Sequence, residues 1–125
     1  MAVQIIIADD EPHITRALSF VLQKEGFIVD TAMNGEEALR KIRGERPKVA
    51  FLDIVMPKMT GLELCSVIKS DPDLKNTYII VLTCKGQELD RQDCLSAGAD
   101  EYMTKPFSPR EVVARVRELF GQGES

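Results

Sequence analysis

Five residues in this sequence combine side chains suited to metal and phosphate chemistry with positions directly after strand-like runs. They are two adjacent carboxylates, a third carboxylate, a hydroxyl and an ammonium, in chain order Asp9, Asp10, Asp53, Thr83 and Lys105. Mg²⁺ prefers a few carboxylate ligands and keeps several waters, and an ammonium can hold an anion as a point charge. The set carries enough charge to hold a divalent cation and a phosphoryl group together.

The runs before these residues have the character of strands in a parallel sheet. They are Val3–Ala8, Val49–Leu52, Ile79–Leu82 and Glu101–Thr104. The first three are apolar and rich in β-branched residues, which is typical of strands that are covered on both faces. Ligands of an open parallel sheet bind beyond the carboxyl ends of its strands. We therefore expect the five side chains to gather at one edge of one sheet.

Each of these residues also has an ordinary interpretation when it is taken alone. Asp9 and Asp10 would suit a solvated loop, and a single strand-end carboxylate such as Asp53 is more often a helix cap. A lysine at position 105 would, by itself, be an exposed loop residue. Pro106 favours the functional interpretation, because a proline fixes the turn and a cis peptide bond there would aim Lys105 across the sheet edge.

Length and composition indicate one soluble globular domain. The 125 residues are 44% hydrophobic and 29% charged, and the formal net charge of −4 argues against direct nucleic-acid binding through a basic field. No apolar stretch approaches the roughly 20 residues that span a bilayer. No leader-like segment precedes the first strand, so we expect a cytoplasmic location and no membrane contact. The cysteines, Cys65, Cys84 and Cys94, lack CxxC spacing and are expected to be reduced thiols.

Strand and helix patterns alternate five times, which predicts an α/β fold with a parallel sheet and helices on both faces. The expected strands are Val3–Ala8, Ile28–Ala32, Val49–Asp53, Ile79–Thr83 and Glu101–Thr104. The expected helices are Pro12–Glu25, Gly35–Arg43, Gly61–Ser70, Glu88–Ala97 and Pro109–Phe120. We expect one domain over residues 1–121, with residues 122–125 as a polar tail or the start of a linker.

Residues at the expected helix ends support these boundaries. Gly26 and Gly44 are candidates for the left-handed residue that follows a helix. Asn34 and Thr60 are candidates for N-caps, because their side-chain oxygens can accept hydrogen bonds from the first turn. Ser108 is followed by a proline and, three residues on, by a glutamate, which is the pattern of a capping box.

Four motifs surround the strand ends, namely IIIADDEP, FLDIVMPKMTGLEL, IIVLTCKG and GADEYMTKPFSPREVVARV. In this order and at this spacing they resemble the receiver domain of two-component response regulators. The resemblance covers essentially all 125 residues. It implies a flavodoxin-like, doubly wound sheet of five parallel strands in the order 2-1-3-4-5.

In such receivers, the aspartate that matches Asp53 accepts a phosphoryl group from a phosphohistidine of a sensor histidine kinase. The resemblance implies Mg²⁺ (or Mn²⁺) as the cofactor. It would be held by Asp10, Asp53 and the backbone carbonyl of Val55, with Asp9 assisting through water. A carboxylate nucleophile, an in-line phosphoryl donor and a metal that spreads charge are the parts that such a transfer needs.

The resemblance also implies which groups hold the phosphoryl oxygens and which residues respond. The Thr83 hydroxyl, the Lys105 ammonium and the backbone amides near Val55 and Cys84 would bind these oxygens. The phosphoryl group would then pull Thr83 inward. Tyr102, which matches the switch aromatic of the family, would follow into the vacated space.

Three positions bear on access and lifetime. Cys84 stands where the family usually has Ala, and it slightly narrows access to the site. Val55 cannot hydrogen-bond through its side chain and Lys85 has no acceptor, so neither can align a water for hydrolysis as an acidic residue would. We therefore expect that the protein dephosphorylates itself slowly and that it is not an enzyme with turnover.

Other phosphotransfer classes fit less well. A haloacid-dehalogenase-like phosphatase needs a second aspartate two residues after its nucleophile, and that position is Val55. A histidine phosphotransfer protein is a helical bundle without the alternating strands, and the only histidine, His13, is expected to lie exposed on the first helix. A degenerate receiver would lack one of Asp10, Asp53 and Lys105, and all three are present.

The last third of the sequence most resembles receivers of winged-helix transcription regulators of the phosphate-regulon type. Such receivers form phosphorylation-dependent homodimers through a charged face, which is matched by Arg91, Asp100, Glu101, Glu111 and Arg115. Exposed charges on helices are also usual on solvated faces. A C-terminal effector domain after Ser125 would make transcription the output. The alternative is a stand-alone receiver or a phosphorelay intermediate that acts by protein–protein interaction.

Overall fold

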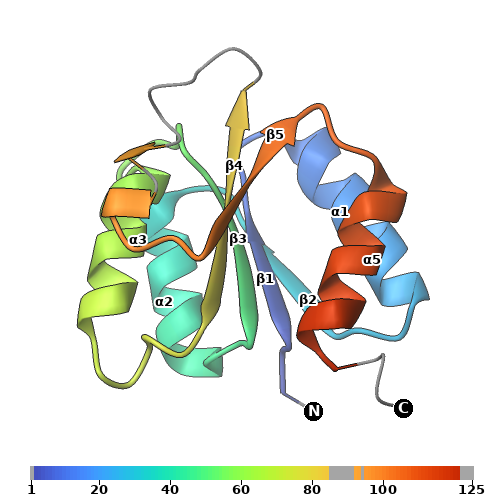
Figure 1. Cartoon of the computed structure of the whole chain (residues 1–125), viewed down its shortest axis with the longest axis horizontal. Helices are drawn as coiled ribbons and strands as arrows, with labels where there is room; N and C mark the ends of the chain where they lie inside the picture. The colour runs from blue at the N-terminus through green and yellow to red at the C-terminus, as the bar shows by residue number, and fades with distance from the viewer. Residues whose placement is uncertain (1, 85–91, 94, 122–125) are drawn as a thin grey trace.

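The computed structural model describes residues 2–84, 92, 93 and 95–121, and it contains a five-stranded parallel sheet. The strands are β1 (Ile5–Ala8), β2 (Val29–Ala32), β3 (Val49–Asp53), β4 (Tyr78–Cys84) and β5 (Glu101–Lys105). Their order in the sheet is β2-β1-β3-β4-β5 (Figure 1). The predicted doubly wound, flavodoxin-like sheet of order 2-1-3-4-5 is therefore confirmed.

The register of the sheet brings the ends of β1 and β3 together. Ala8 on β1 pairs with Leu52 on β3, so the next residues, Asp9 and Asp53, lie side by side at the carboxyl ends of these strands. The strand order reverses between these two strands, because β1 is followed outward by β2 and β3 is followed by β4 on the other side. Doubly wound sheets bind their ligands at this point.

The described helices cover both faces of the sheet. They are α1 (Pro12–Lys24), α2 (Gly35–Glu45), α3 (Gly61–Ser70) and α5 (Pro109–Leu119). The pair α1 and α5 covers one face, and the pair α2 and α3 covers the other (Figure 1). The predicted helix 88–97 lies mostly outside the described residues, although residues 92–93 and 95–96 are helical. Within the described chain, no helix is both long and apolar enough to cross a membrane.

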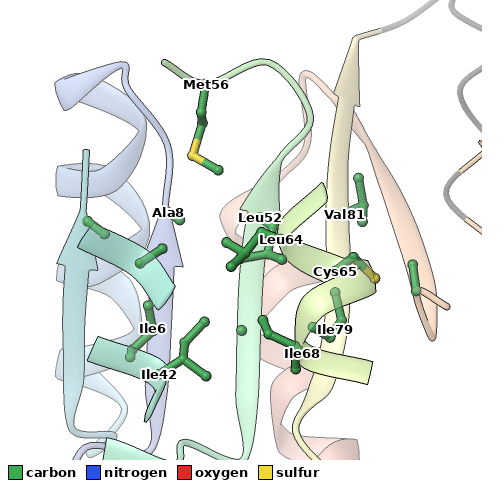
Figure 2. Close-up of a cluster of buried hydrophobic side chains, with 14 of the residues drawn as sticks. Ile6, Ala8, Ile42, Leu52, Met56, Leu64, Cys65, Ile68, Ile79 and Val81 are labelled. Atoms are coloured by element: carbon green, nitrogen blue, oxygen red, sulfur yellow. The ribbon is translucent and has the colours of Figure 1, made fainter. Parts of the chain in front are cut away.

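Two apolar layers hold the helices to the sheet, because alternate residues of a strand point to opposite faces. On the α2/α3 face, the strand residues Ile6, Leu52 and Ile79 pack in one cluster with Ile42 and Ile68 (Figure 2). The layer on the α1/α5 face includes Ile5, Ile7, Phe51, Leu18, Leu22 and Val116. Each fully buried Leu or Ile contributes roughly 1.5–3 kcal/mol. The packed sheet thereby fixes the residues that follow its strand ends.

Four of the predicted helix-end signals are confirmed. The side chains of Asn34 and Thr60 accept hydrogen bonds of 2.8 and 3.1 Å from backbone amides in the first turns of α2 and α3. Ser108 forms a capping box at the start of α5. Gly26, just beyond α1, has a φ of +97°, which glycine adopts without steric cost. These local signals place the helix ends, and hence the loops of the carboxyl edge.

The prediction that Gly44 follows the second helix is wrong. The helix α2 continues through Gly44 to Glu45, and Arg46 takes the left-handed conformation with a φ of 48°. Pro47 sets this end, because proline cannot continue a helix and disfavours the helical conformation at the residue before it. A glycine inside a helix costs only about 1 kcal/mol, which the packing of α2 offsets.

The remaining boundaries agree with the predictions to within two residues. The strand β1 begins at Ile5, two residues later than predicted, and β4 is longer by Tyr78 and Cys84. The extra length of β4 is paired, because β3 and β5 flank it on either side. Cys65 is a buried thiol, as expected. Cys94 and the side chain of Cys84 lie outside the described part of the structure.

Candidate functional site

Three carboxylates gather where β1 and β3 end. One oxygen each from Asp9, Asp10 and Asp53 lies within 4.8 Å of the others. Asp9 is fully buried and Asp53 is 6% exposed, whereas Asp10 is exposed. Mg²⁺ and Mn²⁺ bind oxygen ligands of this kind and keep waters on an open side. The donor set therefore fits the predicted divalent cation, which would also relieve the repulsion among the carboxylates.

Lys105 reaches this cluster from the end of β5. Its ammonium donates a hydrogen bond to Asp9 Oδ2 at 2.7 Å and lies 3.5 Å from Asp53 Oδ1. A further carboxylate, Glu11, accepts a hydrogen bond from the same ammonium at 3.2 Å. The peptide bond between Lys105 and Pro106 is cis. The lysine and the carboxylates, which are far apart in the sequence, thus lie together at one edge of the sheet.

The charges of this cluster do not balance. Burial and the nearby charge of Asp9 raise the pKa of Asp53 to about 6, although Lys105 and a hydrogen bond from the Val55 amide act in the opposite direction. Burial disfavours the charged form of Lys105, but its hydrogen bond to Asp9 and the neighbouring carboxylates outweigh burial and raise its pKa. Above about pH 6, Asp53 is the ionised carboxylate that a nucleophile has to be.

The loop between β3 and α3 holds the backbone of Asp53. The amide of Ile54 donates to the carbonyl of Leu82 on β4 at 3.2 Å, and the amide of Gly61 donates to the carbonyl of Ile54 at 2.9 Å. A Cβ at Gly61 would lie 2.2 Å from the carbonyl oxygen of Asp53, so this approach requires a glycine. Val55, whose carbonyl is a predicted metal ligand, follows in the same loop, and its side chain is exposed.

The predicted switch residues share one face of the sheet. Thr83 lies near the end of β4, is buried, and pairs with Thr104 on β5. Tyr102 pairs with Val81 and is partly buried against the α2/α3 layer. Because residues two apart on a strand point to the same face, Thr83 and Tyr102 lie on the same face of neighbouring strands. Their coupled movement stays a prediction.

Most charges of the predicted dimer face have partners within the chain. The ammonium of Lys69 lies 2.7 Å from Asp100. The carboxylate of Glu111 accepts a hydrogen bond from the Ser108 amide at 3.1 Å, as part of the cap of α5. Arg91 lies outside the described residues. Asp100 and Glu111 therefore have structural roles in the single chain.

The other two predicted dimer residues belong to a closed hydrogen-bonded group between β4, β5 and α5, which we name the Tyr78 network and which consists of Tyr78, Glu101, Arg115 and Glu118. Arg115 Nε and the Tyr78 hydroxyl both donate to Glu101 Oε1 at 2.8 Å. A second guanidinium nitrogen donates to the Tyr78 hydroxyl oxygen at 3.0 Å. The hydrogen bond to Glu101 raises the pKa of Arg115. Each of the four side chains thus forms at least one hydrogen bond with another side chain of the network.

Three residues that form ion pairs or hydrogen bonds in the structure are not among the residues predicted from the sequence. Glu11 has one weak signal, its place directly after two strand-end carboxylates. Lys69 and Tyr78 have none, because their partners come from other elements; Tyr78 is 37 residues from Arg115. Contacts of this kind depend on how the helices and strands pack, and no local spacing encodes them.

Comparison with known proteins assigns a family. Residues 5–117 match the family described as the response regulator receiver domain. The sequence is 42% identical over 121 residues to the alkaline phosphatase synthesis transcriptional regulatory protein PhoP of Bacillus subtilis (strain 168), covering 97% of this chain and 50% of that protein. It is 43% identical over 116 residues to the transcriptional regulatory protein ResD of the same strain, covering 93% and 47%. The chain thus spans about half the length of these curated relatives.

Solved structures of similar chains have the same fold. The chemotaxis response regulator CheY4 of Vibrio cholerae superposes with a TM-score of 0.87 at 30% identity, over 95% of this chain and 99% of that chain. The BeF3-activated DrrB receiver domain superposes with a TM-score of 0.84 at 34% identity, over 97% and 99%. A CheY-like receiver domain protein from Methanospirillum hungatei JF-1 has a TM-score of 0.87 at 30% identity, over 99% and 98%.

Proposed function

The chain belongs to the response regulator receiver domain family, and we propose that its Asp53 accepts a phosphoryl group from a sensor histidine kinase. Membership of the family makes it a domain of two-component signalling. The observation that carries the proposal is one buried strand-end carboxylate, Asp53, flanked by two further carboxylates and by the ammonium of Lys105. That arrangement combines a nucleophile with charges that suit both a cation and a phosphoryl group.

In the proposed transfer, a carboxylate oxygen of Asp53 bonds to phosphorus while the bond from phosphorus to the kinase histidine breaks. Its pKa of about 6 leaves Asp53 ionised at neutral pH. The ammonium of Lys105, 3.5 Å from Asp53, would neutralise charge on the transferred group. The hydroxyl of Thr83 and the backbone amides of Val55 and Cys84 would bind the remaining oxygens, and Tyr102 would then change position with Thr83.

The residues proposed to hold Mg²⁺ or Mn²⁺ are Asp10, Asp53 and the carbonyl of Val55, with Asp9 acting through a water. When bound, the cation supplies positive charge to the transferring phosphoryl oxygens. The buried hydrogen bond between Asp9 and Lys105 supports the indirect role of Asp9, because direct ligation would compete with the ammonium for the same carboxylate.

We propose transcription control as the output, since the relatives named above are transcriptional regulators. Those relatives extend beyond the matched region, and an effector domain there would convert the receiver's change of shape into DNA binding. The receiver itself, residues 1–121 with a tail or linker at 122–125, has a net charge of −4 and would not bind nucleic acid directly. The proposed location is the cytoplasm. A stand-alone receiver or phosphorelay intermediate is the alternative.

A phosphorylation-dependent homodimer is part of the proposal. Two-fold symmetry would pair Glu101 with Arg115, and Arg91 with Glu111, across the two copies. In the single chain, however, Arg115 and Glu101 already bind each other. A dimer would have to exchange this contact for its equivalent between copies, so we expect weak association that falls with salt concentration.

Intact-mass spectrometry tests the proposal. After incubation with acetyl phosphate and Mg²⁺, the wild type should gain one phosphoryl group, because Asp53 alone combines a strand-end carboxylate with the carboxylate pair and Lys105. The Asp53→Asn variant should gain none. If that variant gained the same mass as the wild type, the phosphoacceptor would have to be another residue.

The proposed lifetime of the phosphoryl group is long. The exposed side chain of Val55 has no polar atom that could align a water for attack on the aspartyl phosphate. Lys85, the other residue expected to act here, lies outside the described residues. A Val55→Asn/Lys85→Glu variant should therefore lose its phosphoryl group faster than the wild type. The release of inorganic phosphate measures both rates. Equal half-lives would contradict control by these side chains.

A further inference from the structure

Glu11 lies against Lys105 although it is not part of the carboxylate cluster that fits a cation. Its Oε1 accepts a hydrogen bond from the ammonium of Lys105 at 3.2 Å. Within the described residues, the carboxylates close enough to share a cation are Asp9, Asp10 and Asp53. Glu11 is therefore a neighbour of the lysine and is not a candidate ligand of the metal.

The backbone of Glu11 is anchored on both sides. Its amide donates to Asp9 Oδ1 at 2.9 Å, and its carbonyl accepts from the amides of Ile14 and Thr15 at 3.0 and 3.3 Å. Glu11 is the N-cap residue of α1, where a side chain commonly accepts a hydrogen bond from the first turn. Its side chain makes no such bond and instead contacts Lys105. The contact of this carboxylate with Lys105 thus indicates a role at the site, because the side chain does not cap the helix.

The three N–H donors of the Lys105 ammonium are not shared equally among its neighbours. Asp9 and Glu11 accept hydrogen bonds from it at 2.7 and 3.2 Å. Asp53 forms an ion pair with it at 3.5 Å. Two donors are thus directed to Asp9 and Glu11, which leaves the third for Asp53 or for a phosphoryl oxygen bonded to it.

We propose that Glu11 is a positioning residue that keeps Lys105 beside Asp53 when a divalent cation binds. A cation among the carboxylates would draw on the negative charge of Asp9 and weaken its hold on the ammonium. Glu11, outside the cation site, would keep Oε1 on Lys105, while its other oxygen lies 3.8 Å from the exposed His13. The inference rests on the proposed role of Asp53 as phosphoacceptor, and it adds a residue that organises the phosphoryl-binding ammonium.

The contact is tested by ¹⁵N NMR of lysine side chains, in which a hydrogen-bonded ammonium is recognised by its slow hydrogen exchange. The signal of Lys105 is identified by its loss in Lys105→Met. Glu11→Ala should speed the exchange of this signal about threefold or more, since it removes an ion pair. Glu11→Gln keeps an acceptor oxygen without the charge and should lie in between. Asp73→Asn, a matched loss of one charge at an exposed loop position, should leave the signal unchanged.

Adding Mg²⁺ alone to the same samples isolates the proposed role. The wild-type signal of Lys105 should persist, because Glu11 still holds the ammonium. The difference between the wild type and Glu11→Ala should widen, because Asp9 now contributes less. A difference that vanished with Mg²⁺ would overturn the proposal, since Glu11 would then matter only in the metal-free protein.

Kinetics with acetyl phosphate at saturating Mg²⁺ test the consequence for the reaction. Glu11→Ala should lower the maximal rate of phosphorylation about twofold to fivefold, which is the range for a half-exposed ion pair. The donor concentration at half-maximal rate should change little, because Glu11 acts through Lys105 and does not touch the donor. Glu11→Gln should recover part of the rate, and Asp73→Asn should match the wild type.

The outcomes separate this inference from the proposed function. A phosphorylated wild type with an unchanged maximal rate in Glu11→Ala would overturn the role of Glu11, as would equal hydrogen exchange of Lys105 in the two proteins. A wild type that gains no phosphoryl group would instead refute Asp53 as acceptor, and the NMR comparison would still decide the contact. Thermal unfolding confirms that each variant is folded. If Glu11→Ala is not folded, Glu11→Gln replaces it in both experiments.

Discussion

The molecule carries two charged clusters, one at the ends of β1 and β3 and one between β4, β5 and α5. In the first, three carboxylates face one ammonium, and burial helps to raise the pKa of Asp53 to about 6. In the second, Arg115 contacts Glu101, Glu118 and the hydroxyl of Tyr78. The first cluster is left with buried excess negative charge that a ligand can neutralise. In the second, Arg115 pairs with Glu101, the additional carboxylate of Glu118 is 69% exposed to water, and the cluster joins three elements of the fold.

Burial explains why the imbalance matters in one cluster and not in the other. The side chains of Asp9 and Asp53 are 0% and 9% exposed, so water cannot screen their repulsion. The side chains of Arg115 and Glu101 are 34% and 21% exposed, and ion pairs in such positions contribute little on their own. Perturbed and buried ionisable groups concentrate at functional sites, and this difference supports the proposal that the first cluster is the functional site.

The largest effect is expected from Gly61, whose helix supports the first cluster. A Cβ in Gly61→Ala would lie 2.2 Å from the carbonyl oxygen of Asp53, so α3 or the strand end must move. We expect the free energy of unfolding, measured by urea denaturation, to fall by about 3 kcal/mol, which is typical of strain at a constrained backbone position. The Mg²⁺ affinity of the variant should fall as well.

Gly44 provides the matched control for this substitution. Gly44 lies inside α2, and a Cβ there would meet nothing within 4 Å. The Gly44→Ala variant should therefore be more stable than the wild type by up to about 1 kcal/mol, because alanine favours the helix. If both substitutions changed the stability equally, the close approach of α3 to Asp53 would not be the reason that position 61 is a glycine.

The second effect concerns the excess charge itself. The pKa of Asp53 rises from 3.8 to about 6 on folding, so its ionisation at neutral pH costs the metal-free protein about 3 kcal/mol. Asparagine does not ionise, and we therefore expect Asp53→Asn to raise the free energy of unfolding by up to about 3 kcal/mol in the presence of a chelator. Glu101, which pairs with Arg115, should behave oppositely: Glu101→Gln should lower the free energy of unfolding slightly.

The raised pKa also predicts a pH dependence. Between about pH 4 and pH 6 the folded carboxyl of Asp53 still binds a proton that the unfolded chain has released. The stability of the metal-free wild type should therefore fall as the pH rises through this window, relative to Asp53→Asn. Thermal unfolding of both proteins across the window measures the difference. Curves that run parallel would contradict a raised pKa of Asp53.

The third effect is stabilisation by Mg²⁺, which should depend only on the carboxylates at the ends of β1 and β3. Because the cation binds the folded carboxylates, it should stabilise the wild type by about 1.4 kcal/mol at tenfold excess over its dissociation constant. Asp10→Ala should lose most of the rise in melting temperature. Glu101→Gln should keep it, since Glu101 lies in the other cluster. An Asp10→Ala variant with the full rise would exclude Asp10 as a ligand.

The smallest effect is expected from Tyr78→Phe, which removes one hydroxyl from the Tyr78 network. The loss should be about 0.5 to 1 kcal/mol, the net contribution of an ordinary hydrogen bond. The change also removes one hydrogen bond each from Glu101 and Arg115, whose direct ion pair remains, and so should make both residues easier for a second copy to bind. Light scattering of beryllofluoride-treated protein at low salt should then give a higher average mass for Tyr78→Phe than for the wild type. Equal masses would show that the Tyr78 network does not compete with a dimer.

Most boundaries of the fold follow from local patterns, which is why they could be predicted. The run Val49–Asp53 is a strand in the prediction and in the structure alike, and the cap at Ser108 needs only four consecutive residues. The error at Gly44 arose where two local signals compete. Glycine permits a helix to end, but Pro47 enforces the end, and the packed helix extends as far as the proline allows.

The sequence by itself determined which side chains stand at the strand ends, and the parallel arrangement then required Asp9, Asp53 and Lys105 to meet at one edge. Only the tertiary structure decided that the Lys105 ammonium binds Glu11, 94 residues away. It also decided that Arg115 binds the Glu101 of its own chain and does not need that of a second copy. The physical reason is one of scale. Strand order follows from patterns of several residues, whereas hydrogen bonds and pKa values depend on burial and on distances of a few ångströms, which only the packed layers fix.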